Sequence, residues 1–129
     1  MRRDIEELIA KEGDGKEFEY KGYKCEIWRH PTLLHLCGYV KLPEFHELWG
    51  KSMNELDNLD CHGGITFSEM DKEMDKESLK IGFDCGHYLD YTPGTPVNFP
   101  NSVYRDINYV ESEIKKLVDQ VVLLRNAKG

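Results

Sequence analysis

The sequence predicts an α+β fold, in which a mostly antiparallel sheet is packed by a long C-terminal helix and preceded by a short N-terminal helix. Within residues 17–85, several stretches alternate apolar and polar residues, as half-buried antiparallel strands do. Residues 107–124 instead carry apolar side chains three and four positions apart, which is the spacing of an amphipathic helix. A chain of 129 residues is long enough for one core and too short for two ordinary ones, so we expect a single domain over residues 1–129.

The N-terminal third predicts one helix and two strands. Residues 3–12 place their apolar side chains on one helical face, and Gly13 suits the position after a helix end. Residues 17–30 alternate, and Gly22 allows a tight turn or a bulge among them. Residues 33–42 form a second apolar run, which we expect to be the partner strand.

The middle of the chain predicts two further strands separated by loops. Residues 44–60 indicate a loop with a broken helix, because a glycine and two asparagines interrupt the helical spacing. Residues 64–68 are expected to form a short strand that pairs with the alternating residues 79–85. Residues 69–78 are highly charged with little apolar content, so we expect a mobile connector there. Residues 91–103 are rich in proline and are expected to form a long ordered loop.

The C-terminal helix is the clearest predicted element. Asp106 is a natural N-cap, and the order of acidic residues before basic ones suits the helix dipole. We expect this helix to cover one face of the sheet. Its apolar stripe consists of Ile107, Val110, Ile114, Leu117, Val118, Val121 and Leu124.

The composition argues against several classes of function. With 17 Lys and Arg against 24 Asp and Glu, the net charge is −7. A sequence-independent grip on nucleic acid needs a basic surface, and an acidic chain is repelled by anionic membranes, so we expect neither partner. Neither a signal peptide nor an apolar run of about 20 residues is apparent. We therefore expect a cytoplasmic protein, whose four cysteines are buried thiols or metal ligands.

Two polar clusters are candidates for chemistry. The first is Asp60-Cys61-His62-Gly63-Gly64, in which Gly63 and Gly64 let the backbone approach a ligand closely or adopt positive φ. The second lies in residues 82–90, and we expect the two clusters to adjoin neighbouring strands so that their histidines converge. Imidazole and carboxylate groups together ligate zinc, manganese or iron with an open position. The candidate metal ligands are His62, Asp84, His87 and Asp90.

Two interpretations in which these residues have a structural role stay open. The first cluster is equally typical of a turn that enters a strand, with a histidine whose hydrogen bonds are satisfied. A structural zinc site is the other alternative, although its spacing is not that of a CxxC knuckle. Its ligands would be Cys61, His62, Cys85 and His87. Of the remaining histidines, His46 is a better site candidate than His30 or His35, because it lies in a polar, glycine-containing segment.

Five short segments occur in an order and spacing that resemble a group of small uncharacterised bacteriophage and prophage proteins. They are LCGYV at 36–40, HELWGK at 46–51, HGGITFS at 62–68, GFDCGH at 82–87 and YRDINYVESE at 104–113. The resemblance extends over about residues 20–122, and it departs from the group at Glu47 and Gly86. It implies a phage or prophage setting with action in the bacterial cytoplasm, and it supplies no reaction. The residues it favours as functional are His46, His62, Asp84, His87, Asp90, Tyr104 and Arg105.

These features lead to three functional hypotheses. The first is a site, assisted by a divalent metal such as zinc or manganese, that binds or hydrolyses a small phosphorylated or nucleotide-like ligand, with a counter-defence role. In that site His46 and His62 are the candidate catalytic residues. The candidate ligand-binding residues are Lys51, Gly63, Gly64, Tyr104 and Arg105. The second is a non-catalytic protein that inhibits a host protein through its acidic surface and charged connector. The third is the structural zinc domain.

Overall fold

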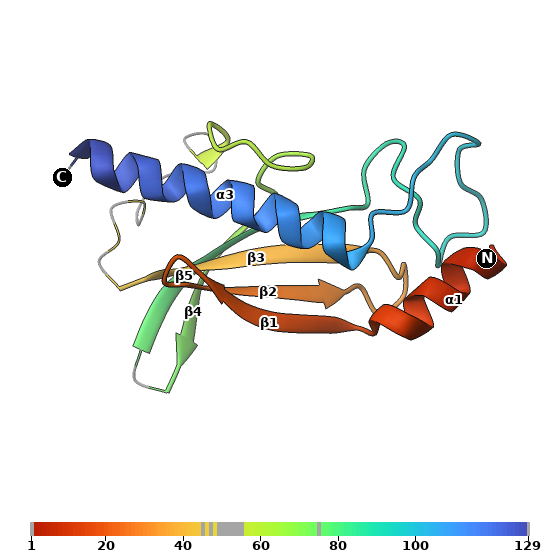
Figure 1. The fold of residues 1–129 in the computed structure, drawn as a ribbon, viewed down its shortest axis with the longest axis horizontal. Helices are drawn as coiled ribbons and strands as arrows, with labels where there is room; N and C mark the ends of the chain where they lie inside the picture. The colour runs from red at the N-terminus through yellow and green to blue at the C-terminus, as the bar shows by residue number, and fades with distance from the viewer. Residues whose placement is uncertain (1, 45, 47, 49–55, 75, 129) are drawn as a thin grey trace.

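The computed structural model describes residues 2–44, 46, 48, 56–74 and 76–128. Within this part of the chain, five strands form one antiparallel sheet in the order β1-β2-β3-β5-β4, and helix α3 lies along one face of it (Figure 1). The predicted α+β architecture is confirmed. The elements are α1 (Arg3–Glu12), β1 (Gly15–Tyr20), β2 (Tyr23–Arg29), β3 (Leu36–Pro43), β4 (Phe67–Glu73), β5 (Lys76–Asp84) and α3 (Ile107–Lys128). None of the described helices is both long and apolar enough to cross a membrane.

Strands β1, β2 and β3 form a meander close to the one that the sequence predicts. Lys21 and Gly22 both adopt positive φ, 50° and 84°, which is the backbone geometry of a two-residue hairpin turn. The predicted strand over residues 17–30 is therefore two strands, and the predicted partner strand begins at Leu36 rather than at residue 33. Much of the predicted broken helix over 44–60 lies outside the described residues.

Helix α3 packs against the sheet along the predicted apolar stripe. The side chains of Val110, Ile114 and Leu117 are fully buried. A Cβ at Gly38 would lie 2.8 Å from Phe83 and 2.9 Å from Ile114, so this glycine permits the close approach of helix and sheet. The predicted cap is confirmed as well, because a carboxylate oxygen of Asp106 accepts the backbone N–H of Tyr109 at 2.8 Å.

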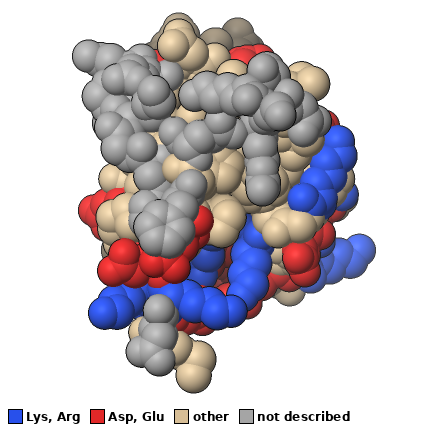
Figure 2. Space-filling model, turned by 90° about the vertical axis from the view of Figure 1, so that its left-hand side faces the viewer, with Lys and Arg blue, Asp and Glu red and all other residues tan. Residues whose placement is uncertain are grey.

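The opposite face of the sheet carries charged and aromatic side chains. Lys41 lies within 4 Å of the carboxylates of Glu26, Asp71 and Glu73, so one ammonium group joins strands β2, β3 and β4. Tyr39 contacts Phe67 edge to face, with 5.3 Å between ring centroids. Basic and acidic side chains are interleaved on the end of the molecule seen in Figure 2. On this face of the sheet, Lys41 and Lys80 are thus paired with carboxylates of other strands.

The prediction of a mobile connector over residues 69–78 is wrong, because residues 69–73 and 76–78 belong to two paired strands. Strands β4 and β5 pair from Phe67 opposite Gly82 to Glu73 opposite Lys76. Both faces of the hairpin end are exposed to water, so the apolar alternation that marks a half-buried strand is missing. Opposite charges face each other across the strands instead and favour the pairing. These pairs are Glu69 with Lys80, Lys72 with Glu77 and Glu73 with Lys76.

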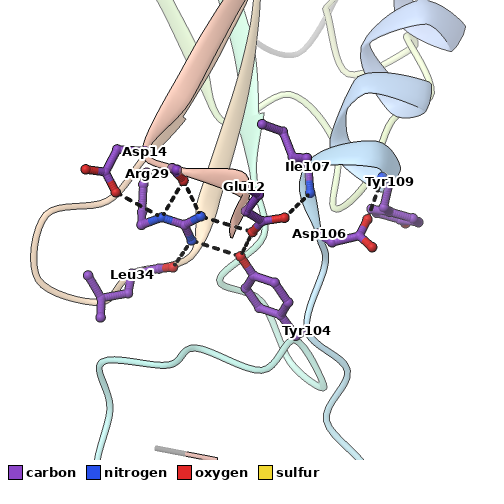
Figure 3. Close-up of polar contacts among 9 residues, drawn as sticks. Glu12, Asp14, Arg29, Leu34, Tyr104, Asp106, Ile107 and Tyr109 are labelled. Carbon is purple, nitrogen blue, oxygen red and sulfur yellow. Dashed lines mark hydrogen bonds and ion pairs between the residues drawn. The ribbon is translucent and has the colours of Figure 1, made fainter. Parts of the chain in front are cut away.

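A buried ion pair fixes the other end of the molecule. The Arg29 side chain is 3% exposed, and its guanidinium donates to the Glu12 carboxylate at 3.0 Å and to the Gly13 carbonyl at 2.7 Å (Figure 3). The second Glu12 oxygen accepts the backbone N–H of Ile107 at 3.1 Å, at the start of α3. The Tyr104 hydroxyl also donates to Glu12. This network joins α1, β2 and α3, and it holds the segment that precedes α3 in place.

Candidate functional site

Residues from both predicted clusters meet around the carboxylate of Asp90, whose side chain is 1% exposed. One oxygen accepts His62 Nε2 at 2.7 Å and the backbone N–H of His87 at 3.0 Å. The other oxygen accepts Arg105 Nε at 3.0 Å. We call these four residues, Asp90, His62, His87 and Arg105, the Asp90 hub. It brings together three segments that are distant in the sequence.

The paired glycines allow the two clusters to approach. Gly63 and Gly64 have φ values of 71° and 81°, a conformation that residues with a side chain rarely adopt. A Cβ at Gly63 would collide with the imidazole of His87, so the ring packs directly on the glycine backbone. The rings of His62 and His87 lie 6.2 Å apart between centroids, and the structure thus brings together the two histidines expected to converge.

His62 lies between a buried carboxylate and a tyrosine hydroxyl. Its Nδ1 is 2.7 Å from the hydroxyl of Tyr109, in the first turn of α3. A carboxylate only accepts hydrogen bonds, so Nε2 of His62 carries the proton donated to Asp90. The guanidinium of Arg105 lies over the Tyr109 ring, 5.0 Å from its centroid. Tyr109 was not among the predicted site residues, although it is the second tyrosine of the 104–113 segment, four positions after Arg105.

The accessible part of the site is formed by His87 and Asp84, whose side chains are about one-third exposed. His87 Nε2 is itself shielded from solvent and lies 3.2 Å from a carboxylate oxygen of Asp84, yet it has no hydrogen-bond partner of acceptable geometry. The Asp84 carboxylate itself is fixed by the backbone N–H of Gly86 at 3.0 Å and by the Thr66 hydroxyl at 3.2 Å. A nitrogen without a partner therefore lies beside a carboxylate that is held in position.

The four predicted metal ligands lie in one cluster without forming a closed metal cage. Both ring nitrogens of His62 and both oxygens of Asp90 are bonded to other protein groups. Both Asp84 oxygens are bonded as well, to Gly86 and Thr66, so Asp84 and His87 differ from the other two by their one-third exposed side chains and by the unpartnered Nε2 of His87. Among the residues that the structure describes, no group of three or more His, Cys, Asp or Glu side chains is arranged to hold a metal ion.

Three other predicted site residues lie apart from the Asp90 hub or outside the described chain. His46 Nε2 is 3.0 Å from the Tyr23 hydroxyl, and its backbone N–H bonds to Pro43 at the end of β3. Asp84 pairs with the other end of β3, so about 20 Å of strand separates His46 from the hub. The Tyr104 hydroxyl belongs to the Glu12 network, and Lys51 lies outside the described residues.

The four cysteines are buried and free. Burial raises the pKa of Cys25 and of Cys61 to about 12 and that of Cys37 to about 11. A thiol with such a pKa stays protonated at neutral pH and is a poor nucleophile and metal ligand in that state. Cys25 and Cys61 lie within the hydrophobic core, as expected for the first of the two alternatives, buried thiols or metal ligands.

His35 makes the stability of the fold depend on pH. The residue is 6% exposed, its Nδ1 has no hydrogen-bond partner, and its ring stacks on His30 with 5.0 Å between centroids. Burial lowers the pKa of His35 below its ordinary value of 6.5, an effect that Asp84 and Asp90 partly oppose. The unfolded chain consequently binds this proton more readily than the folded protein does.

We therefore expect the free energy of unfolding to decrease as the pH falls below 6.5, because the lowered pKa of His35 favours the neutral, folded form. Urea denaturation at pH 7.5 and at pH 5.5 measures this change. In His35→Leu the decrease should be smaller, whereas His30→Gln, which alters the partly exposed neighbour, should retain it. An equal decrease in wild type and His35→Leu would show that another group is responsible.

No family model, curated protein or solved structure matches the chain. The residues around Asp90 offer a guanidinium held by a buried carboxylate, a histidine bonded to a tyrosine, and a histidine nitrogen without a hydrogen-bond partner beside a second carboxylate.

Proposed function

We propose that the protein binds a phosphate-bearing, nucleotide-like ligand together with a divalent cation, such as manganese or zinc, at the Asp90 hub. The observation that supports this proposal is the buried Nε2 of His87, which has no hydrogen-bond partner and lies 3.2 Å from Asp84, next to an arginine held by Asp90. In the phage setting that the sequence segments imply, such a ligand would be a host signalling nucleotide. Its capture or hydrolysis would then serve counter-defence.

The pair Asp84 and His87 suits one edge of a metal site. Two donors that bind the same ion at about 2.0–2.1 Å with tetrahedral angles lie roughly 3.3 Å apart. The distance between the Asp84 oxygen and His87 Nε2 is 3.2 Å. Two protein ligands suit a cation that arrives with its ligand, because phosphate oxygens and water can complete the coordination. The absence of a third protein ligand among the described residues is compatible with this arrangement.

Arg105 suits the phosphate end of such a ligand. Within the described chain, only its Nε is bonded, to Asp90, so both terminal amino groups are available to a bound anion. Its side chain is 26% exposed, and its plane is fixed by Asp90 and by the Tyr109 ring. A guanidinium held in this way binds phosphate oxygens in a bidentate manner. The cation offsets the charges of Asp84 and Asp90, which would otherwise repel an anion.

Calorimetric titration with manganese–ADP, with Mn²⁺ alone and with ADP alone tests this function. We expect manganese–ADP to bind more tightly than either component. Arg105→Gln should weaken binding of the complex by about tenfold to a hundredfold, because it removes a charged hydrogen bond to phosphate. Asp84→Asn should weaken binding of the complex and abolish any binding of Mn²⁺ alone.

The matched control is Arg3→Gln, which removes an arginine that is 92% exposed on α1. This variant has the same change of charge as Arg105→Gln and should bind manganese–ADP as the wild type does. Equal affinities in all three variants and wild type, or no binding of the complex, would contradict the proposed function.

A second candidate, inhibition of a host protein, is favoured by apolar side chains that a well-ordered loop holds in solvent. Tyr88, Val97 and Phe99 are 74%, 85% and 59% exposed. The loop is fixed by hydrogen bonds such as that from the Thr92 N–H to the Asn98 side chain at 2.9 Å. Exposed apolar groups on a rigid loop are typical of a protein contact. Polar substitutions at Val97 and Phe99 would impair this function and leave nucleotide binding intact.

A further inference from the structure

The geometry around His62 points to a reaction at the Asp90 hub. We propose that Tyr109 is a catalytic acid that donates its hydroxyl proton to the leaving oxygen of a bound phosphate ester, and that His62 replaces this proton. The inference rests on the proposed function, because it needs a phosphate ester held by Arg105. It goes further in assigning hydrolysis to the site and in naming the proton donor.

The first support is a continuous chain of short hydrogen bonds. The Tyr109 hydroxyl is 2.7 Å from His62 Nδ1, and His62 Nε2 is 2.7 Å from the Asp90 carboxylate. A reacting hydroxyl, an imidazole and a buried carboxylate that orients the imidazole form the general arrangement of a proton relay. The Asp90 carboxylate orients the ring by accepting the Nε2 proton, so Nδ1 of His62 faces the Tyr109 hydroxyl.

The second support is the position of the hydroxyl relative to the phosphate-binding arginine. The Arg105 guanidinium lies over the ring of Tyr109, and Asp90 holds both Arg105 and the relay histidine. A phosphate bound by the terminal amino groups of Arg105 would therefore lie near the half-buried tyrosine. Burial raises the pKa of Tyr109 above 10, so that at neutral pH the hydroxyl keeps the proton that it would donate.

The reaction is hydrolysis, with water as the second reactant. Water attacks phosphorus as the bond between phosphorus and the ester oxygen breaks. The ester oxygen takes the proton of the Tyr109 hydroxyl and leaves as an alcohol. The tyrosine oxygen takes the Nδ1 proton of a His62 that starts with a proton on each ring nitrogen, which leaves the neutral ring with its Nε2 proton on the hydrogen bond to Asp90. The attacking water keeps one proton on the product phosphate and releases the other to solvent, from which His62 is protonated again.

Hydrolysis of phenyl phosphate and of 4-nitrophenyl phosphate with Mn²⁺ tests the inference. Phenolate leaves poorly without a proton, whereas nitrophenolate leaves well without one. We expect wild type to hydrolyse both esters. Tyr109→Phe should slow phenyl phosphate hydrolysis by about 10² to 10⁴-fold and slow the nitrophenyl ester far less. Tyr20→Phe, at a tyrosine bonded to Asp119 away from the hub, should hydrolyse both as wild type does.

Equal slowing of the two esters in Tyr109→Phe would mean that the ring only supports the site, and it would overturn the inference. Unchanged rates in that variant, or no hydrolysis of either ester by wild type, would overturn it as well. Binding of manganese–ADP by wild type and Tyr109→Phe is measured separately. Retained binding without hydrolysis would refute the catalytic role and leave the proposed binding function standing, whereas loss of both in wild type would refute both.

Discussion

Arg29→Ala is expected to lower the free energy of unfolding by about 3–5 kcal/mol, the usual cost of breaking a buried ion pair. The substitution leaves the Glu12 carboxylate, whose side chain is 5% exposed, without its cationic partner. It also removes the donors that satisfy the carbonyls of Gly13 and Leu34. The entry of α3 depends on the same carboxylate, so the loss extends from α1 to the start of that helix.

Chemical denaturation of wild type and Arg29→Ala at pH 7 measures this effect. Arg3→Ala is the matched control, because the pair that Arg3 forms with Glu7 is exposed, and its removal should leave the unfolding midpoint nearly unchanged. A decrease below 1 kcal/mol in Arg29→Ala would contradict the role given to the buried network.

Asp90→Ala is expected to lower the free energy of unfolding by about 2–4 kcal/mol and to remove manganese–ADP binding. Hydrogen bonds to a charged group contribute about 1.5–3 kcal/mol each. The expected loss is smaller than the sum over these bonds, because Arg105 is partly exposed and can bond to water once Asp90 is removed. Binding should be lost because Arg105 and His62 lose the carboxylate that positions them.

The free energy of unfolding at acidic pH gives an independent check on the contribution of Asp90 to stability. Burial alone would raise the pKa of Asp90, but hydrogen bonds from His62 and Arg105 lower it below 3.8 overall. Its contribution to stability is therefore present above pH 3.8 and lost as the pH falls further, and Asp90→Ala should lack this part of the decline. Glu7→Ala, which removes the exposed partner of Arg3 on α1, is the control. If the free energy of unfolding declined with pH in Asp90→Ala as it does in wild type and in the control, the Asp90 carboxylate would not contribute to stability as described.

Most of the fold could be predicted because an element that buries one face repeats its apolar residues regularly, every two positions in a strand and every 3.6 positions in a helix. Strands β2 and β3 and helix α3 each bury one face, so their patterns are clear. The end of the β4–β5 hairpin buries neither face, and its charge pairs become visible only once the register is known. Arg29 could not be predicted as a buried residue, because its partners lie 5 to 75 positions away in the sequence.

The site was only partly predictable for a related reason. The glycines after His62 and the polar residues from Asp84 to Asp90 identify two segments that the structure brings together. His46 belongs to a similar polar segment, but sequence distance does not reveal which end of a strand a loop adjoins. In the sequence, Tyr109 looks like an ordinary helix residue. Its contact with His62 depends on how α3 packs beside the loop that carries His62.

The position of a bound manganese ion is the sharpest test of a nucleotide site at the Asp90 hub. Mn²⁺ broadens the NMR signals of nearby amides, so manganese–ADP added to ¹⁵N-labelled protein maps its own binding site. We predict the strongest broadening at the amides of Asp84 to His87 and of Gly63, and its loss in Asp84→Asn. Broadening that is strongest in the charged hairpin around residues 69–77, or spread evenly over the acidic surface, would contradict a nucleotide site at the Asp90 hub.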